Sequence, residues 1–392
     1  MVNGFASLMR RGTITCFDYQ GNVLWTQEIL TAGRMIPLLH EGKLVIIRQV
    51  YPPAENGNFT NEHAHAPLAE WTQLQALNLK TGAVSWTTEC GVNMGFIPLP
   101  QSRADGRTVA VVGRGGGHGP PETPEGISMI DLSDGSTLLT LPLEGFMSTM
   151  SFSRYDGNVI VYHRGECLKV DEVSGEILER ILILDSIPGR VFEGGEWADE
   201  SVTISAGKSS REITQESNLL VGNYSFFRSY QRNLLGRVNL KTNQVECLML
   251  PVQMQRTMTG DDRLLWGPEG SLSSFKTSKK PRSMLQNEWA IEHNKVKNSR
   301  GLVVMGDDRS QGNGWGHIAS PTPMVVGEHL YITSMSGLVY VIRWQTERLD
   351  EHALIAINDL GQLGNAWTRA SLGFADGRLF AHTIGEIIAI GE

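Results

Sequence analysis

The stretch GTITCFDYQGNVLW, from Gly12 to Trp25, decides how this chain is expected to fold. An apolar run ends at Asp18, a turn containing Gly21 follows, and a second apolar run leads to Trp25. An Asp or Asn side chain accepts a hydrogen bond from the backbone two residues further on, and a glycine with positive φ then lets the chain reverse. The stretch therefore predicts a β-hairpin whose second strand carries a tryptophan.

The same hairpin pattern recurs, with intervals of 60, 53, 40 and 68 residues between successive Asp or Asn residues. The further copies are LQALNLKTGAVSW (74–86), SMIDLSDGSTLL (128–139), LKVDEVSGEIL (168–178) and GRVNLKTNQVECL (236–248). Asn243 replaces the glycine in the last copy, and Asn tolerates the same backbone conformation. Two more apolar runs joined by a glycine turn lie upstream, as in MIPLLHEGKLVIIRQV (35–50). Each unit is therefore predicted to be four antiparallel strands.

Repeats of this kind predict an all-β fold, a β-propeller of four-stranded antiparallel blades, because such small sheets bury both faces by stacking around an axis. We expect a single domain over residues 1–392 with eight blades, seven being the alternative. The pattern starts within a blade and is least regular over 185–217 and 252–310. The predicted blades are 3–30, 34–90, 94–144, 147–184, 190–251, 257–310, 317–358 and 370–390.

Closure of the ring is imperfect in the sequence. Each terminus supplies three predicted strands, where one closing blade needs four in total. Either Met1 is an internal start, with a leader and a closing strand missing, or an irregular blade closes the ring. We favour the first explanation.

Composition limits the function classes. The chain has 392 residues, 41% of them apolar and 19% charged, which is typical of a globular protein. A net charge of −8 and a pI near 5.7 argue against nucleic-acid binding, which needs a basic face. No run approaches about 20 apolar residues, so we expect no transmembrane helix, and the N-terminal residues lack the order of a signal peptide.

The four cysteines lie far apart in the sequence and form no CxxC pair, which argues against a zinc ribbon or a thioredoxin-like site. We expect them to be buried free thiols in strands, since free Cys behaves as a small apolar residue. They are Cys16, Cys90, Cys167 and Cys247.

The pattern Gly–x–apolar–x–apolar–Leu/Phe–Asp/Asn–x–x–(x)–Gly–x–apolar–x–Trp resembles the PQQ-like repeat of the quinoprotein-like β-propellers. That family includes BamB-like assembly proteins and quinoprotein alcohol dehydrogenases. The resemblance implies that Trp25 and Trp86 dock between neighbouring blades. The match is strong at 12–25 and 74–86, fair at 127–139, 167–178 and 235–248, and HIASPTPMVVGEHLYITSMSGLVYVI (317–342) resembles the family's first strand pair.

The resemblance implies two classes of function. The first is a non-catalytic scaffold for binding or assembly, and the second is an oxidoreductase that holds PQQ with Ca²⁺. The alcohol dehydrogenases carry two adjacent cysteines, which this chain lacks, and no catalytic base or Ca²⁺ ligand maps onto it. We therefore expect the non-catalytic role. The resemblance also implies a bacterial, periplasmic or otherwise extracytoplasmic monomer with a protein or small-molecule partner.

A candidate ligand-binding face comes from long insertions. In a four-stranded blade, the loops joining strands two and three and the loops between blades share one face. The insertions RQVYPPAENGNFTNEHAHAPLAEW (48–71), RGGGHGPPETPEG (114–126) and DDRSQGNGWGHIASP (307–321) are predicted to lie there, and long loops on a rigid framework often carry function. The candidate residues are His63, His65, Arg114, His118, Trp315 and His317.

A metal is one interpretation of this face. His63, His65 and His118, with Glu62 beside them, could hold zinc or another transition metal. Together with His317 they make a metal-assisted hydrolase a third possible function. The alternative is that the histidines never meet across a wide face, or that they bond the glycine-rich backbone.

Other motifs favour structural explanations. GRGGGHG (113–119) could cradle an anion, but we prefer a loop that needs unusual φ values. GDDR occurs at 260–263 and 306–309 and could bind Ca²⁺, but turn chemistry explains it as well. The chain contains no GxSxG, no HExxH and no catalytic Cys–His signature.

Overall fold

The described part of the chain consists of β-strands, in agreement with the expected all-β class. No helix occurs within the described residues. The computed structural model describes residues 9–32, 37–49, 72–92, 100–114, 124–144, 152–193, 196–204, 218–228, 234–249, 321–333, 337–361, 368, 370–383 and 386–391.

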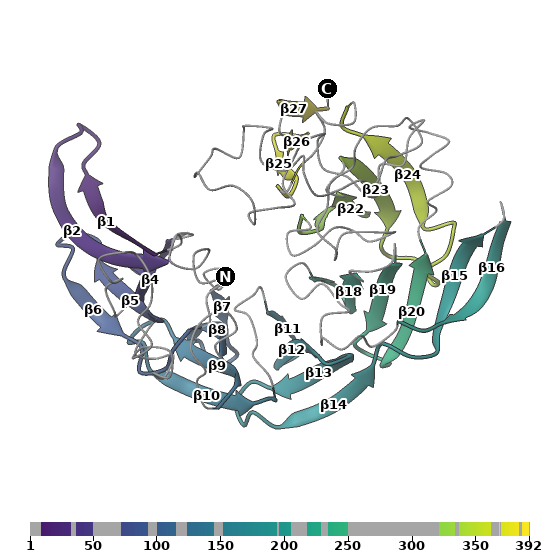
Figure 1. Ribbon diagram of the computed structural model, residues 1–392, viewed down its shortest axis with the longest axis horizontal. Helices are drawn as coiled ribbons and strands as arrows, with labels where there is room; N and C mark the ends of the chain where they lie inside the picture. The colour runs from purple at the N-terminus through teal and green to yellow at the C-terminus, as the bar shows by residue number, and fades with distance from the viewer. Residues whose placement is uncertain are drawn as a thin grey trace, which may run out of the picture. The chain divides into compact units, whose positions relative to one another are not determined.

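The chain divides into two compact units, residues 1–161 with 169–179 and residues 162–168 with 180–392. The first unit contains three small antiparallel sheets built from consecutive strands (Figure 1). The first is two-stranded, with β1 (Met9–Phe17) and β2 (Val23–Ala32). The other two are four-stranded: β3 (Leu38–His40), β4 (Lys43–Gln49), β5 (Thr72–Asn78) and β6 (Val84–Thr87); and β7 (Gln101–Ser102), β8 (Thr108–Arg114), β9 (Gly126–Asp131) and β10 (Thr137–Pro142).

A fourth sheet contributes residues to both units. Its strands run in the order β11-β12-β13-β14, which is again the order in the sequence. They are β11 (Ser153–Tyr155), β12 (Asn158–His163), β13 (Glu166–Asp171) and β14 (Ile177–Leu182).

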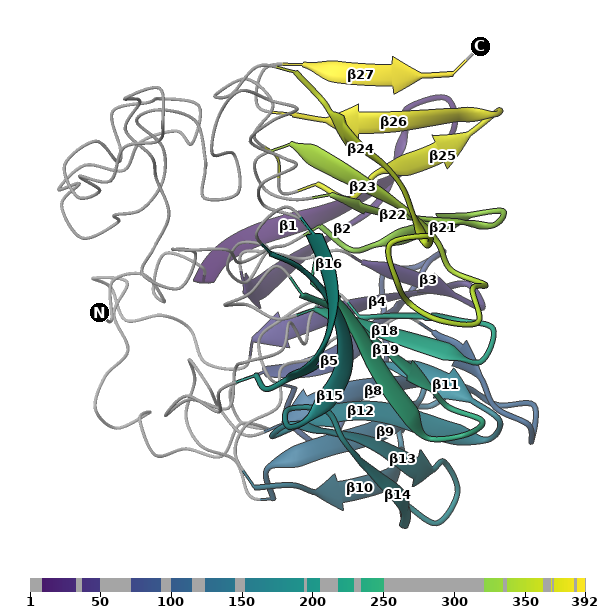
Figure 2. The ribbon, with the colours of Figure 1, turned by 90° about the vertical axis from the view of Figure 1, so that its right-hand side faces the viewer.

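The second unit contains three further sheets. A six-stranded sheet holds β15 (Ile187–Glu193), β16 (Glu196–Val202), β17 (Leu219–Val221), β18 (Tyr224–Arg228), β19 (Leu234–Asn239) and β20 (Gln244–Met249). A four-stranded sheet holds β21 (Met324–Val326), β22 (His329–Thr333), β23 (Leu338–Arg343) and β24 (Leu354–Asp359). A three-stranded sheet holds β25 (Gly373–Ala375), β26 (Arg378–His382) and β27 (Ile387–Ile390), and it packs against β21 to β24 (Figure 2).

The predicted hairpin turns are confirmed. In each copy a side-chain Oδ1 accepts a hydrogen bond from the backbone N–H two residues further on, at 2.8–3.0 Å. The acceptors are Asp18, Asn78, Asp131, Asp171 and Asn239. The residue that completes each turn has a positive φ, and these residues are Gly21, Gly82, Gly135, Gly175 and Asn243.

A bulky outer-strand side chain lies directly on the turn glycine of the following sheet. A Cβ built on Gly82 would lie 2.7 Å from Cδ2 of Trp25, and one built on Gly135 would lie 2.6 Å from Cε3 of Trp86. Leu139 covers Gly175 in the same way. The indole Nε1 of Trp25 also donates to the carbonyl of Leu79 at 2.8 Å. Turn geometry and sheet packing therefore both require glycine at these positions.

The core of the first unit lies between successive sheets. Every described side chain of β9, and all of β8 except Thr108, is buried, as expected for central strands that are covered on both faces. One apolar cluster joins β3–β6 to β7–β10 through residues such as Ile47, Trp86 and Ile130. Burial of this kind contributes about 25 cal/mol per Å² of apolar surface.

The sheet of β15 to β20 differs from the predicted four strands. The hairpin of β15 and β16, residues Ile187–Val202, adds to the outer strand β20 by parallel pairing of Gly189–Val191 with Cys247–Met249. Gly189 permits this approach, because a Cβ there would lie 2.7 Å from the Sγ of Cys247. The hairpin falls within 185–217, where the repeat pattern weakens.

The predicted order of sheets is wrong at one place. We expected a blade over 257–310 between the sheet of β17 to β20 and the sheet of β21 to β24. These two sheets instead share one apolar core, in which Phe226, Leu235 and Leu248 meet Leu330, Tyr340 and Ile357. Residues 257–310 lie outside the described residues. Blade number, ring closure and the single-domain organisation stay predictions.

Replacing Gly135 with alanine tests the contact between turn glycine and tryptophan. We expect Gly135→Ala to lower the free energy of unfolding by about 2–5 kcal/mol, because a non-Gly residue is strained at positive φ and the new methyl group overlaps Trp86. Gly106→Ala is the matched control in the same sheet, since Gly106 has a φ of 85° but nothing within 4 Å of a built Cβ. It should cost about 1–2 kcal/mol. Equal losses in urea denaturation would contradict the proposed packing role of the glycine.

Candidate functional site

Most of the predicted ligand-binding face lies outside the described residues. This applies to His63, His65, His118, Trp315 and His317, and also to Glu62 and to both GDDR segments. Their proximity, and a metal held by His63, His65 and His118, stay predictions.

Arg114 is the one candidate residue that the structure describes. It ends β8, and 7% of its surface is exposed. Its Nη1 donates to Ser128 Oγ at 3.3 Å and to Thr140 Oγ1 at 3.4 Å, and these two hydroxyls lie 2.9 Å apart. Arg114 thus connects β8 to β9 and β10 at the point where the predicted loop 114–126 leaves the sheet.

Within the described segments, no three His, Cys, Asp or Glu side chains form a group that could hold a metal ion. The four cysteines form no disulfide. Cys90, Cys167 and Cys247 are buried, as expected, whereas Cys16 is partly exposed and Cys90 lies outside a strand. No helix in this part of the chain is long and apolar enough to cross a membrane.

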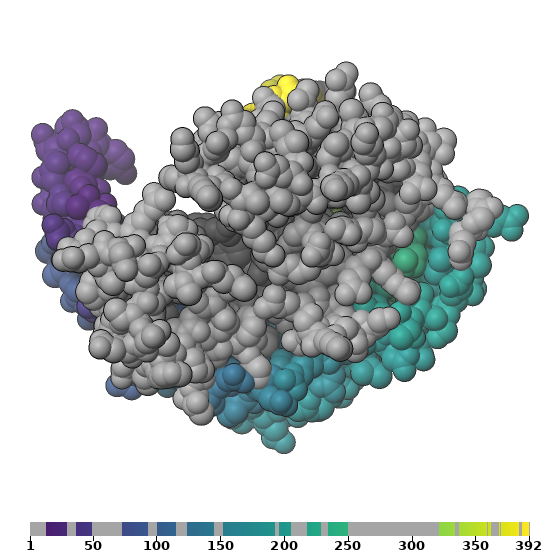
Figure 3. Space-filling model, viewed as in Figure 1, coloured from purple at the N-terminus to yellow at the C-terminus, as the bar shows by residue number. Residues whose placement is uncertain are grey.

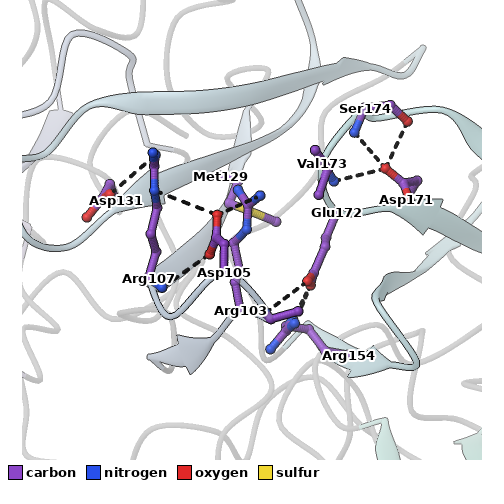
Figure 4. A network of polar contacts seen from close by, with 11 residues as sticks. Arg103, Asp105, Arg107, Met129, Asp131, Arg154, Asp171, Glu172, Val173 and Ser174 are labelled. Atoms are coloured by element: carbon purple, nitrogen blue, oxygen red, sulfur yellow. Dashed lines mark hydrogen bonds and ion pairs between the residues drawn. The ribbon is translucent and has the colours of Figure 1, made fainter.

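A network of charged side chains joins neighbouring turns in the first unit (Figure 4). Glu172, at the start of the β13–β14 turn, is buried and accepts a hydrogen bond from Nε of Arg154 at 2.5 Å. Its other carboxylate oxygen accepts a bond from the backbone N–H of Ala104 at 3.5 Å, in the turn between β7 and β8. A buried carboxylate is stable only when it is paired in this way. Glu172 therefore connects β11 and the β13–β14 turn to the sheet of β7 to β10.

The β7–β8 turn carries the rest of this network. Arg103 contacts Asp105 at 3.2 Å and the sulfur of Met129 at 3.7 Å. Arg107 lies 3.7 Å from both Asp105 and Asp131. Each carboxylate here is engaged by an arginine, so the network links turns and sheets.

Asp171 adjoins the network shown in Figure 4. It accepts hydrogen bonds from the backbone N–H groups of Ser174 and Val173 and from the Ser174 hydroxyl. The bonds from Ser174 hold the pKa of Asp171 below its usual value, because they favour the charged carboxylate.

Tyr162 is a buried polar group of the second unit. Its hydroxyl lies 2.7 Å from Ser225 Oγ, and its ring lies 5.8 Å from that of Phe227. Burial raises the pKa of Tyr162 well above its usual value. The side chain is 7% exposed, so its hydroxyl serves the core rather than a surface site.

A fully buried arginine joins β19 to the loop after β23. Arg237 donates from Nε to Glu246 at 2.9 Å, and its guanidinium lies 4.3 Å from the ring centroid of Tyr224. It also donates to the carbonyls of Trp344, Thr346 and Glu347. Five donors in a fixed plane suit this task better than a lysine would.

We name the β15–β16 hairpin, Ile187–Val202, the arm. Arg190 of the arm donates two bonds of 2.6 Å to the carboxylate of Glu351. Asp199 is paired with Arg190 at 3.4 Å and with Arg348. Trp197 packs on the core that the sheet of β17 to β20 shares with that of β21 to β24. The pair of Arg190 and Asp199 lies within the arm. The arm therefore contacts the neighbouring sheets of the second unit through Trp197 and through two ion pairs, Arg190 with Glu351 and Asp199 with Arg348.

Sequence reasoning missed the arm. Gly194-Gly195 between VFE and EWA is a hairpin signal. No local pattern, however, predicts that β15 pairs in parallel with β20, where Gly189 lies opposite Cys247, 58 residues downstream. The pairs of Arg190 with Glu351 and of Arg237 with the loop after β23 join segments far apart in the sequence, so they were also missed.

Comparison by sequence was made with family models and with curated proteins. No family model matches the chain, and no curated protein matches it.

Comparison with solved structures finds similar chains at low identity. BamB from Moraxella catarrhalis is 12% identical, with 96% of this chain and 88% of BamB covered and a TM-score of 0.38. Saccharomyces cerevisiae Sqt1 is 8% identical, with 95% and 76% covered and a TM-score of 0.44. AztD from Citrobacter koseri is 10% identical, with 88% and 64% covered and a TM-score of 0.41. At these values none of them assigns the chain to a family.

Replacing Arg237 tests whether its contacts hold β19 to the loop after β23. Arg237→Met should lower the free energy of unfolding by about 3–5 kcal/mol, because the partly buried Glu246 and the backbone carbonyls of the loop after β23 lose a fully buried donor. Arg180→Met is the control, since Arg180 is half exposed and pairs with Glu166 at 2.7 Å; it should cost about 0–1 kcal/mol. Similar urea midpoints for the two variants would contradict the assigned role.

The pair of Arg190 and Glu351 predicts a pH dependence. Hydrogen bonding to Arg190 lowers the pKa of Glu351 from 4.5 to about 2. A depressed pKa contributes stability above pH 4.5, and this contribution is lost as the pH falls toward 2. The urea midpoint of the wild type should therefore exceed that of Glu351→Gln at neutral pH, and the difference should shrink between pH 4.5 and 2. A difference that does not change with pH would contradict the ion pair.

Proposed function

We propose that this chain is a non-catalytic PQQ-like β-propeller that serves as a scaffold for binding or assembly. The observation that carries the proposal is the repeated contact of Trp25, Trp86 and Leu139 with the turn glycines of the following sheets. A series of small antiparallel sheets joined by one repeated contact is what a propeller requires. Trp25 and Trp86 are also the two positions that the PQQ-like repeat assigns to docking.

A scaffold role accords with the use of charge in the described residues. The hydrogen bonds and ion pairs of Glu172, Arg237 and Arg190 join turns and sheets, so they stabilise a framework. Binding on a rigid framework is usually carried by its long loops.

The proposed ligand face is formed by the loops 48–71, 114–126 and 307–321, with His63, His65, His118, Trp315 and His317 as contact residues. Arg114 holds the strand from which the second loop leaves. The proposed ligand is a protein or a small molecule, and the proposed location is extracytoplasmic. We propose that the chain acts as a monomer.

No ligand set for PQQ held with Ca²⁺ can be assigned among the described residues. They contain no group of three metal-type side chains, and the chain has no adjacent cysteines. We therefore derive no redox step.

Site-specific photocrosslinking tests the proposal. A photoreactive residue is placed in turn at positions 63, 118 and 315, and at Val84, an exposed residue of β6, as a control. In a native envelope extract the three loop positions should capture the same partner, and position 84 should not. Capture at position 84 alone would contradict the loop face. Turnover of an alcohol with PQQ, Ca²⁺ and a dye acceptor would contradict the non-catalytic role.

A further inference from the structure

The arm ends in β16, whose outer edge pairs with no other strand of the described part of the chain. β16 is the last strand of its sheet and has β15 as its one neighbour among the described strands (Figure 1). The two strands pair over seven consecutive positions without a shift of register. The teal residues of this part of the chain are visible on the surface in the space-filling view (Figure 3). A free strand edge presents backbone N–H and C=O groups that another extended chain can pair with.

β16 lacks most of the features that block strand pairing. Proteins protect sheet edges with very short strands, proline, bulges or charged side chains, lysine above all, and of these β16 has only the charge of Glu196, Asp199 and Glu200. β16 is seven residues long, its sequence is EWADESV, and it contains no proline, lysine or bulge. Its side chains from Ala198 to Ser201 are exposed.

The two faces of β16 have different roles. Trp197 and Asp199 lie on the face that packs within the chain, on the shared core and on Arg348. Alternation along the strand places Glu196, Ala198 and Glu200 on the opposite face, and all three are exposed. That face therefore presents two carboxylates on either side of a small apolar residue.

These charges select the partner. A second copy of β16 would bring carboxylates against carboxylates, and like charges across strands are destabilising. A strand with Lys or Arg four residues apart would instead place a cation near Glu196 and another near Glu200. The negative charge of the whole chain, −8, favours approach of the same basic partner.

We propose that the free edge of β16 binds an extended, basic segment of a partner protein by strand addition. The segment carries Lys or Arg at positions i and i+4, with a small or apolar residue between them. Backbone hydrogen bonds supply affinity, and Glu196 and Glu200 supply selectivity. This surface uses residues distinct from the proposed loop face, so either proposal can fail alone.

A pair of synthetic peptides tests the proposal on the full chain. One has Lys at i and i+4, Val between them and Thr elsewhere, and the other has Glu in place of Lys. The Lys peptide should bind about tenfold tighter, because two cross-strand charge pairs change from repulsive to attractive. Binding should weaken as salt is added. No heat of binding at about 1 mM Lys peptide would overturn the proposal.

Charge reversal locates the binding. The variant Glu196→Lys with Glu200→Lys should lose the Lys peptide and gain the Glu peptide. The control, Glu176→Lys with Glu179→Lys, changes the charge equally at exposed residues at and near β14 and should bind like the wild type. Equal loss in both variants would overturn the assignment, because it would show general electrostatic attraction.

Hydrogen exchange on the wild type keeps the test independent of how the variants fold. The Lys peptide should slow amide exchange in residues 196–202 and leave residues 177–182 of β14 unchanged. Unchanged exchange in 196–202 would overturn the proposal. A dimer of the unliganded chain whose formation protects the same residues would also overturn it, since a second copy would then occupy the edge.

Discussion

In the first unit, the packing of one sheet on the next depends on hairpin-turn glycines that carry no side chain. The outer strand of the preceding sheet places a bulky residue over each of them. Trp25 on Gly82, Trp86 on Gly135 and Leu139 on Gly175 repeat this contact. The glycine needs its positive φ to reverse the chain, and the same missing Cβ makes room for an indole or an isobutyl group. One residue therefore determines both the local turn and the packing of the next sheet, and aromatic burial adds a large apolar contribution at each junction.

The sequence allowed prediction of features that depend on neighbouring residues. The Asx turns at Asp18, Asn78 and Asp131 involve atoms within a few residues of one another, so composition and spacing were sufficient. The arm was not predicted, because its parallel pairing with β20 depends on Gly189 meeting Cys247 across a distant part of the chain. Spacing alone also placed a blade over 257–310, whereas shared side-chain packing brings β17–β20 directly against β21–β24. Of the candidate site, Arg114 is described, and its hydroxyl partners Ser128 and Thr140 carry no sequence signal.

Charged residues in the described segments serve two purposes. Buried or partly buried pairs, such as Arg237 with Glu246 and Arg190 with Glu351, fix loops against sheets, where removal of one partner leaves an uncompensated charge. The carboxylates of β16 at Glu196 and Glu200 are exposed instead, and in our proposal they select the strand that pairs with this edge. The charges of the described residues are thus divided between internal pairs, which hold loops against sheets, and exposed carboxylates at the edge of β16.

Tryptophan rings of one sheet lie on the turn glycines of the next. NMR of the glycine α-protons measures this contact. With glycine labelled selectively, the α-protons of Gly135 should resonate upfield of the usual glycine range, because the Trp86 ring lies over them. They should return to that range in Trp86→Leu, while the α-protons of Gly106, which has no such neighbour, should not move. α-Protons of Gly135 at ordinary positions in the wild type would contradict the contact on which the account of the fold is built.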